Sequence, residues 1–178
     1  FLEHPTRADL TTLLAPNAFW EEMSGHPDYD EWWRARDTRR ACYNIRPAML
    51  VVGGTYDAED CYGAWNLYRA LNRQSPSTPC HLVVGPWAHG AWRNGGRTLG
   101  AFDFGSDASW EYYMEHFEVP FFDHYLRDGN TDEAAPLPAA AVFSSGDNRW
   151  HTFGRFLSRG ARKLTLYLAG GGILDTRR

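Results

Sequence analysis

The sequence predicts a mixed α/β protein that changes to short β-strands towards its C-terminal end. Two apolar segments, residues 48–53 and 80–85, are rich in Val and Leu, end in glycine and flank a segment with helical spacing. Strand, helix and strand within about 40 residues form a βαβ unit, which implies parallel strands and a right-handed crossover. After a proline-containing linker at residues 128–138, short apolar runs alternate with polar turns. These features predict an α/β domain followed by the start of a β domain.

Composition limits the broad class of the protein. The chain has 178 residues, of which 43% are hydrophobic and 15% aromatic, and its formal net charge is −4. This length suits one globular domain or slightly more. A transmembrane span is not expected, because the mean hydropathy is −0.51 and the chain has no run of about 18 apolar residues. The 18 basic residues are dispersed among 22 acidic ones, so we expect neither a nucleic-acid nor a membrane partner.

Residues 1–40 are predicted to contain short helices separated by Pro5, Pro16 and Pro27. Proline lacks a backbone N–H and disrupts a helix interior, so each proline marks a boundary. Asn17 and Ser24 are candidate N-caps, because Asn and Ser side chains accept hydrogen bonds from the free N–H groups at a helix start. The aromatic content of this region indicates that it packs on a larger body.

The βαβ unit follows. Residues 48–53 and 80–85 are continuous apolar runs with β-branched side chains, a pattern typical of strands buried on both faces. Residues 59–73 between them have the apolar periodicity of a helix. Its apolar positions are Trp65, Leu67, Tyr68 and Leu71.

Residues 109–127 are predicted to form one long helix in which Pro120 causes a kink or a new start. The linker at 128–138 then separates this helix from three strand-like runs with polar turns between them. The runs are residues 139–144, 151–156 and 163–168.

Two polar residues follow the two predicted parallel strands. Asp57 comes just after the first strand, and His89 comes just after the second. Adjacent parallel strands lie about 4.8 Å apart, and open α/β sheets bind ligands at their carboxyl ends, so these side chains can come within hydrogen-bond distance. An Asp that orients a His is the acid–base part of a nucleophile–His–acid triad, and the order acid then histidine is a known triad order.

Each of these residues also has a structural interpretation. Asp57 could cap the following helix, whose start also carries Glu59 and Asp60, and His89 could be a packed histidine in an aromatic loop. The same four residues could hold a metal ion, but the chain has no HxH or HxxxH ligand pair, and we predict no cofactor. We favour the acid–base pair because the two positions match on consecutive parallel strands.

Other residue types carry weaker signals. Trp87 and Trp92 flank His89 and are candidates for an apolar substrate pocket, although core aromatic residues are an equally good interpretation. The cysteines are odd in number and have no CxxC spacing, so we expect buried free thiols rather than disulfides or a zinc site. They are Cys42, Cys61 and Cys80.

The segments GGTYDAED at residues 53–60 and GPWAHG at residues 85–90 resemble the acid and histidine segments of CocE/NonD-type hydrolases. That group includes α-amino-acid ester hydrolases, cocaine esterases, glutaryl acylases and X-Pro dipeptidyl peptidases. VPFFDHYL at 119–126 looks like the helix before the family's linker, and VFSSGDNRW at 142–150 is similar to the opening of its C-terminal jelly roll. The resemblance implies that Asp57 is the triad acid and His89 the triad base.

The resemblance also implies a domain organisation. Residues 1–40 would be the tail of a helical cap region, and residues 41–130 the C-terminal part of an α/β-hydrolase domain. Residues 137–178 would be the first strands of a truncated jelly roll. The family's serine nucleophile lies in a G-x-S-x-G motif upstream of the acid, and this chain has no such motif. We therefore expect an upstream half of the same protein to supply the serine and the oxyanion donors.

The expected activity belongs to that parent protein. It is hydrolysis of a small-molecule ester or amide through an acyl-serine intermediate, with acyl-amino-acid, β-lactam side-chain or X-Pro substrates as candidates. The chain by itself is expected to be inactive, because a base without a nucleophile has nothing to activate. Two alternatives stay open: a non-catalytic binding module, and a hydrolase of the same fold with an Asp nucleophile. The sequence leaves the cellular compartment open.

Overall fold

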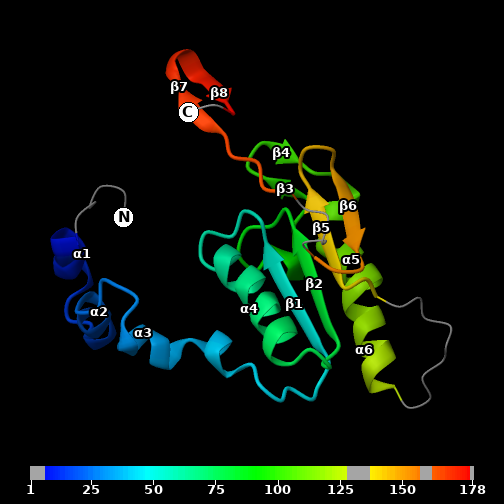
Figure 1. The fold of residues 1–178 in the computed structure, drawn as a ribbon, viewed down its shortest axis with the longest axis horizontal. Helices are drawn as coiled ribbons and strands as arrows, with labels where there is room; N and C mark the ends of the chain where they lie inside the picture. The colour runs from blue at the N-terminus through cyan, green and yellow to red at the C-terminus, as the bar shows by residue number, and fades with distance from the viewer. Residues whose placement is uncertain (1–6, 128–136, 157–161, 177–178) are drawn as a thin grey trace.

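A four-stranded sheet forms the centre of the molecule (Figure 1). The computed structural model describes residues 7–127, 137–156 and 162–176. The first three strands in spatial order are parallel, and the fourth is antiparallel to the third. In that order the strands are β1 (Met49–Gly54), β2 (Cys80–Gly85), β5 (Ala140–Ser144) and β6 (Arg149–Phe153).

The predicted βαβ unit is confirmed. Helix α4 (Cys61–Gln74) connects β1 to β2, and the two strands pair in parallel from Met49 and Cys80 to Gly54 and Gly85. This register places the final glycines of the two strands side by side. The loops that carry Asp57 and His89 therefore leave the sheet at the same edge.

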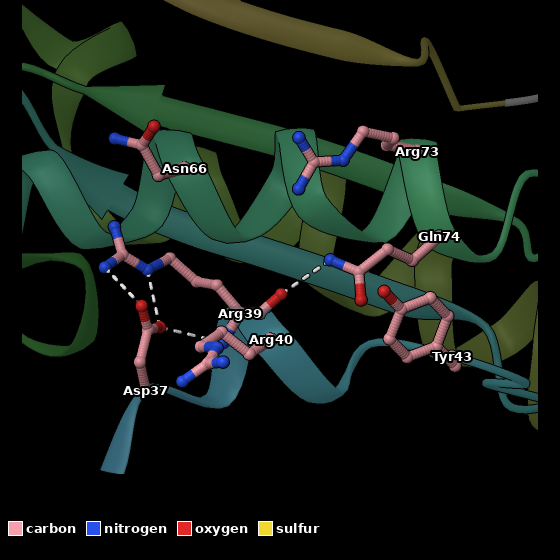
Figure 2. Close-up of a pocket in the computed structure, with 7 residues that line it drawn as sticks. All are labelled: Asp37, Arg39, Arg40, Tyr43, Asn66, Arg73 and Gln74. Atoms are coloured by element: carbon pink, nitrogen blue, oxygen red, sulfur yellow. Dashed lines mark hydrogen bonds and ion pairs between the residues drawn. The ribbon is translucent and has the colours of Figure 1, made fainter. Parts of the chain in front are cut away.

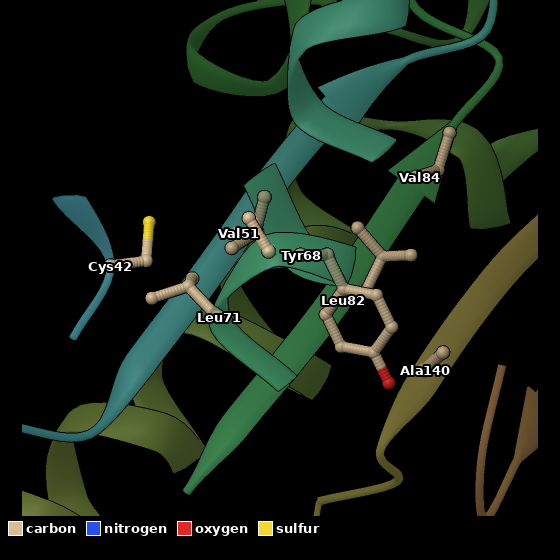
Figure 3. Packing of buried hydrophobic residues seen from close by; sticks show 8 residues of the cluster. Cys42, Val51, Tyr68, Leu71, Leu82, Val84 and Ala140 are labelled. Atoms are coloured by element: carbon tan, nitrogen blue, oxygen red, sulfur yellow. The ribbon is translucent and has the colours of Figure 1, made fainter. Parts of the chain in front are cut away.

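Helices cover both faces of the sheet because successive strand side chains point to opposite faces. Leu82 and Val84 face α4, in a buried cluster with Val51, Leu71 and other residues (Figure 3). Val83 faces the other side, where the buried side chains come from the second helical segment and the loop after β2. They include Trp87, Tyr113, Phe117 and Ala141.

That second helical segment was expected as one helix over residues 109–127. It consists of α5 (Trp110–Tyr113), a π-helical turn (Met114–Glu118) and α6 (Val119–Leu126). Pro120 lies in the first turn of α6, where a missing N–H is tolerated. The widened turn before it lets the helical path continue without the hydrogen bond that Pro120 cannot donate.

Three short helices lie to one side of the sheet in Figure 1. They are α1 (Arg7–Leu14), α2 (Ala18–Ser24) and α3 (Glu31–Arg36), and Pro16 and Pro27 fall between them as expected. Asn17 is the N-cap of α2, since its side chain accepts a hydrogen bond from Trp20 N at 2.9 Å. A 3₁₀ turn (Thr38–Ala41) leads from α3 towards β1.

The segment from residue 137, which is predicted to begin a β domain, contributes its first strand to the central sheet. Strand β5 pairs in parallel with β2, with Leu82 opposite Ala140 and Val84 opposite Val142. Ala140 and Ala141 are fully buried between the two helical layers. Small apolar side chains suit this confined position, and neither their composition nor the turn that follows reveals which sheet the strand joins.

The remaining strands form two small hairpins. One is β3 (Thr98–Leu99) with β4 (Phe102–Asp103), which the sequence pattern did not predict. The other is β7 (Tyr167–Ala169) with β8 (Ile173–Asp175), and it overlaps only the end of the run expected at 163–168. None of the described helices is long and apolar enough to cross a membrane. All three cysteines are free, but only Cys42 is buried.

Candidate active site

The loops after β1 and β2 are held together by backbone hydrogen bonds. Thr55 N donates to Gly85 O at 2.9 Å, and Tyr56 N donates to Trp87 O at 3.1 Å. These bonds continue the strand pairing beyond the sheet. As a result Asp57 and His89, which are 32 residues apart in sequence, come into direct contact.

Asp57 uses both carboxylate oxygens. Oδ1 accepts hydrogen bonds from the backbone N–H groups of Glu59 at 2.8 Å and Asp60 at 3.0 Å, and Oδ2 lies 3.0 Å from Nδ1 of His89. Its side chain is 0% exposed. Asp57 therefore contacts the histidine and holds the turn before α4, but it does not cap that helix, whose N-cap position is Asp60.

The surroundings of Asp57 favour its ionised form. Burial raises the pKa of this carboxyl, but hydrogen bonds from the Asp60 and Glu59 backbone and from His89 outweigh burial, so the pKa lies below its ordinary value. The pKa of His89 is raised, first by the hydrogen bond to Asp57 and then by the nearby charge of Glu59. An ionised carboxylate beside a histidine with a raised pKa is the electrostatic arrangement that an Asp–His pair needs for proton transfer.

His89 is half exposed, in contrast to Asp57. Its side chain is 49% exposed, and Nε2 lies 4.0 Å from Glu59 Oε2. Gly90 follows with φ +74°, a left-handed conformation that glycine adopts without strain. The backbone can therefore turn immediately after His89, whose Nδ1 faces Asp57 while its side chain stays half exposed.

Trp87 does not line an open pocket, contrary to one of the two interpretations from the sequence. Its side chain is 0% exposed, and Nε1 donates a hydrogen bond to Ala108 O at 2.6 Å. It packs edge-to-face on Tyr113 in the core. Trp92 is half-buried, and its ring lies 6.0 Å from the ring of His89. Of the two tryptophans, Trp92 is thus the one beside the accessible histidine.

The structure explains why glycine ends both strands, which the sequence pattern alone did not predict. A Cβ atom on Gly54 would lie 2.1 Å from Trp87 O, and a Cβ on Gly85 would lie 2.2 Å from the Trp87 ring. Glycine at these two positions lets the Trp87 backbone and ring pack against the strand ends. Two strands that both end in glycine before a polar loop were the signal for this close approach.

The site also has the composition of a cation site. One ligand atom each of Asp57, Asp60 and His89 lies within 4.8 Å of the others. However, both carboxylate oxygens of Asp57 already accept hydrogen bonds, and the histidine atom that contacts Oδ2 is Nδ1. A carboxylate that hydrogen-bonds to one ring nitrogen of a histidine typically orients that histidine and is not itself a ligand of the metal, which binds the other ring nitrogen.

Residues 3–91, half of the 178-residue chain, match the family model described as X-Pro dipeptidyl-peptidase (S15 family). The chain belongs to this family. The matched segment contains both Asp57 and His89. A comparison with curated protein sequences found no match.

Solved structures resemble nearly the whole S15-family chain. An aminopeptidase from the marine sediment archaeon Thaumarchaeota archaeon superposes with a TM-score of 0.83 at 28% identity over 98% of the chain. An α-amino acid ester hydrolase superposes with a TM-score of 0.85 at 27% identity over 99% of the chain. The chain spans 29% of the length of the first protein and 30% of the second. The similarity shows an α/β-hydrolase-like fold.

Proposed function

We propose that this chain supplies the acid and the base of a serine hydrolase that cleaves esters or amides. One observation carries the proposal: Asp57, buried and held by two backbone N–H groups, contacts His89 Nδ1, while the His89 side chain stays half exposed at the carboxyl edge of the sheet. This is the arrangement in which an acid orients a catalytic histidine and stabilises its charged form. Membership of the S15 family supports the same function.

In the proposed reaction, Nε2 of neutral His89 removes the proton of a serine hydroxyl as its oxygen attacks the substrate carbonyl. Asp57 remains ionised and stabilises the imidazolium. The imidazolium then protonates the leaving alcohol or amine, which leaves an acyl-serine. A water molecule, deprotonated by His89, hydrolyses this ester and restores the serine.

The serine would come from a part of the protein outside this chain. Among the described residues, His89 Nε2 makes no hydrogen bond to a hydroxyl group, and its nearest charged neighbour is Glu59. Strand β1 is an edge strand of the described sheet, and an open hollow of about 450 Å³ runs along it. We infer that further strands of the intact protein cover this edge and bring the nucleophile to His89.

The charges around His89 favour a substrate with a positively charged group. Glu59 and Asp60 are 71% and 69% exposed, and each has a carboxylate oxygen within 4.0 Å of the His89 ring nitrogens. Two exposed carboxylates, Glu59 beside Nε2 and Asp60 beside Nδ1, would attract a protonated amine to the surroundings of His89. The names of the two similar proteins, an aminopeptidase and an α-amino acid ester hydrolase, point to such substrates.

The test is made on the intact protein. We expect His89→Ala to lower kcat for aminoacyl esters by about three orders of magnitude and to prevent labelling of the serine by a fluorophosphonate probe. His151→Ala is the matched control, because His151 is equally exposed and also contacts an aspartate. It should keep normal turnover and labelling.

Two other outcomes would favour the alternatives. Intact protein that neither turns over esters nor reacts with the probe would favour a non-catalytic binding module. Turnover that is lost with a chelator and restored by a divalent ion would favour a metal at Asp57, Asp60 and His89.

A further inference from the structure

A hollow of about 470 Å³ lies beside helix α4, towards the end of the helix that is remote from Asp57 (Figure 2). Its walls come from the segment between α3 and β1 and from the outer side of α4. Helix α4 has 14 residues, so it separates the far end of this hollow from the His89 loop by about 20 Å. The lining residues are Asp37, Arg39, Arg40, Tyr43, Asn66, Arg73 and Gln74.

The charges that remain free in this hollow are positive. Arg39 and Asp37 neutralise each other through two hydrogen bonds of 2.6 Å (Figure 2). Arg40 has only a distant and exposed partner, Glu31 at 3.8 Å. Arg73 has no ion pair within the part of the chain that the structure describes. Arg40 and Arg73 therefore face the hollow with their charges largely uncompensated.

A second hollow of about 330 Å³ continues this basic surface. It is lined by three arginines, Arg69, Arg73 and Arg155, and its other lining residues carry no carboxylate. Arg73 belongs to both hollows. The arginines of the two hollows span more than 100 positions of the sequence, in a chain whose net charge is −4. In the folded chain they lie close together around α4.

One buried polar atom in the wall of the first hollow, Gln74 Oε1, lacks a hydrogen-bond donor within the described residues. Gln74 Nε2 donates to Arg39 O at 2.6 Å, but the buried Gln74 Oε1 has no partner within the described residues. A buried acceptor without a donor is unfavourable and requires an explanation. Tyr43, which is exposed at the rim, carries a hydroxyl group of the donor type that this oxygen lacks.

A purely structural role explains only part of this arrangement. Arg73 lies in the last turn of α4, where a cation interacts favourably with the helix dipole. That role does not extend to Arg40, which lies on a different element, or to Arg155, which follows β6. These three arginines nevertheless line adjoining hollows, although they come from three different parts of the chain.

We propose that the first hollow binds a small oxyanion with at least two negative charges, of the phosphate-ester or dicarboxylate type. Arg40 and Arg73 supply its cationic contacts, because the planar guanidinium group pairs with both phosphate and carboxylate oxygens. A volume of about 470 Å³ falls within the range of small-molecule sites. The lining of this hollow includes neither Asp57 nor His89, and the proposal does not depend on the proposed hydrolase function.

The experiment measures binding of pyrophosphate and of malonate to the intact protein by calorimetry at constant ionic strength. We expect pyrophosphate, malonate or both to bind, and the stronger ligand identifies the chemical type. Arg40→Gln and Arg73→Gln should each weaken binding by about tenfold or more, because each removes hydrogen bonds to a charged group. Arg149→Gln is the control, since this exposed arginine on β6 lines neither hollow.

A conservative variant separates binding from helix stability. Arg73→Lys keeps a positive charge at the end of α4 but lacks the planar fork, so we expect the Tm to be retained while anion affinity falls. The proposal is wrong if neither anion binds. It is also wrong if Arg40→Gln, Arg73→Gln, Arg73→Lys and Arg149→Gln all bind the anions as the unchanged protein does.

Discussion

Two histidine–aspartate pairs in this chain have the same contact distance and the same histidine exposure. His89 Nδ1 lies 3.0 Å from Asp57 Oδ2, and His151 Nε2 lies 3.0 Å from Asp147 Oδ2. Both histidine side chains are 49% exposed. The pKa of Asp147 is lowered, chiefly by a hydrogen bond from the Ser144 side chain, and so has the same direction as the pKa of Asp57. The distance between the two side chains, the exposure of the histidine and the direction of the aspartate pKa shift therefore do not distinguish the two pairs.

The aspartates differ in what surrounds them. Asp57 is 0% exposed and accepts two backbone hydrogen bonds besides its contact with His89, whereas Asp147 is 47% exposed. The pair at Asp57 joins loops from two parallel strands, while the pair at Asp147 lies within one hairpin. An exposed local pair contributes little, but a buried carboxylate with several donors holds its partner in one orientation. Burial of the acid distinguishes the candidate active site.

The largest expected difference between the pairs is in turnover by the intact protein. Asp57→Asn should lower kcat by about three orders of magnitude or more, because the neutral amide no longer stabilises the His89 imidazolium. Asp147→Asn should leave kcat unchanged. Steady-state kinetics with an aminoacyl ester measures both variants. Equal effects of the two substitutions would contradict the assignment of Asp57 as the triad acid.

Stability should separate the pairs next. Asp57→Ala leaves the N–H groups of Glu59 and Asp60 without an acceptor, so we expect the free energy of unfolding to fall by about 2 kcal/mol. Asp57→Asn retains an acceptor oxygen, so its free energy of unfolding should fall by less. Asp147→Ala should have no measurable effect, since Asp147 is exposed. Urea denaturation measures all three, and a large loss in Asp147→Ala would show that exposure is a poor guide here.

The glycines beside the two pairs should respond in opposite directions. Gly90, next to His89, has φ +74°, so Gly90→Ala should lower the free energy of unfolding by about 1 kcal/mol and reduce kcat by displacing His89. Gly146, next to Asp147, does not have a positive φ, and an added Cβ there would meet only Ser144 Oγ at 3.8 Å. Gly146→Ala should be neutral or slightly stabilising. Thermal unfolding of both variants tests this contrast.

The smallest expected effect concerns the pH profile. Glu59 helps to raise the pKa of His89, and His89 must be neutral to act as a base. Glu59→Gln should therefore lower this pKa and move the acidic limb of kcat/KM to lower pH. Glu21→Gln, an exposed change on α2, is the control for charge alone. A limb that stays in place or moves to higher pH would show that Glu59 does not act on His89.

Much of the local structure was predictable from the sequence because it depends on neighbouring residues. The strand expected at 80–85 lies at Cys80–Gly85, and the helix expected at 59–73 lies at Cys61–Gln74. Apolar periodicity and terminal glycines determine these elements. The approach of Asp57 to His89 was also predictable, since parallel strands carry their following loops to the same edge.

Other features could not be predicted because they depend on contacts between distant segments. The partner of β5 is chosen by the space beside β2, which the sequence of residues 140–144 does not describe. Trp87 adjoins the histidine loop, yet its ring turns into the core because Gly54 and Gly85 leave room for it. The clustering of Arg40, Arg73 and Arg155 likewise follows from the packing of the connecting segments around α4.

The sequence by itself determined the βαβ unit, the order of acid and histidine, and the helix that follows Asp57, because short-range hydrogen bonding and hydrophobic periodicity specify them. Only the tertiary structure decided that Asp57 is buried while Asp147 is not, that β5 joins the central sheet, and that five arginines line the two hollows. Burial and charge clustering are properties of surfaces formed by several segments. They arise only when the folded chain excludes water from some side chains and leaves others exposed.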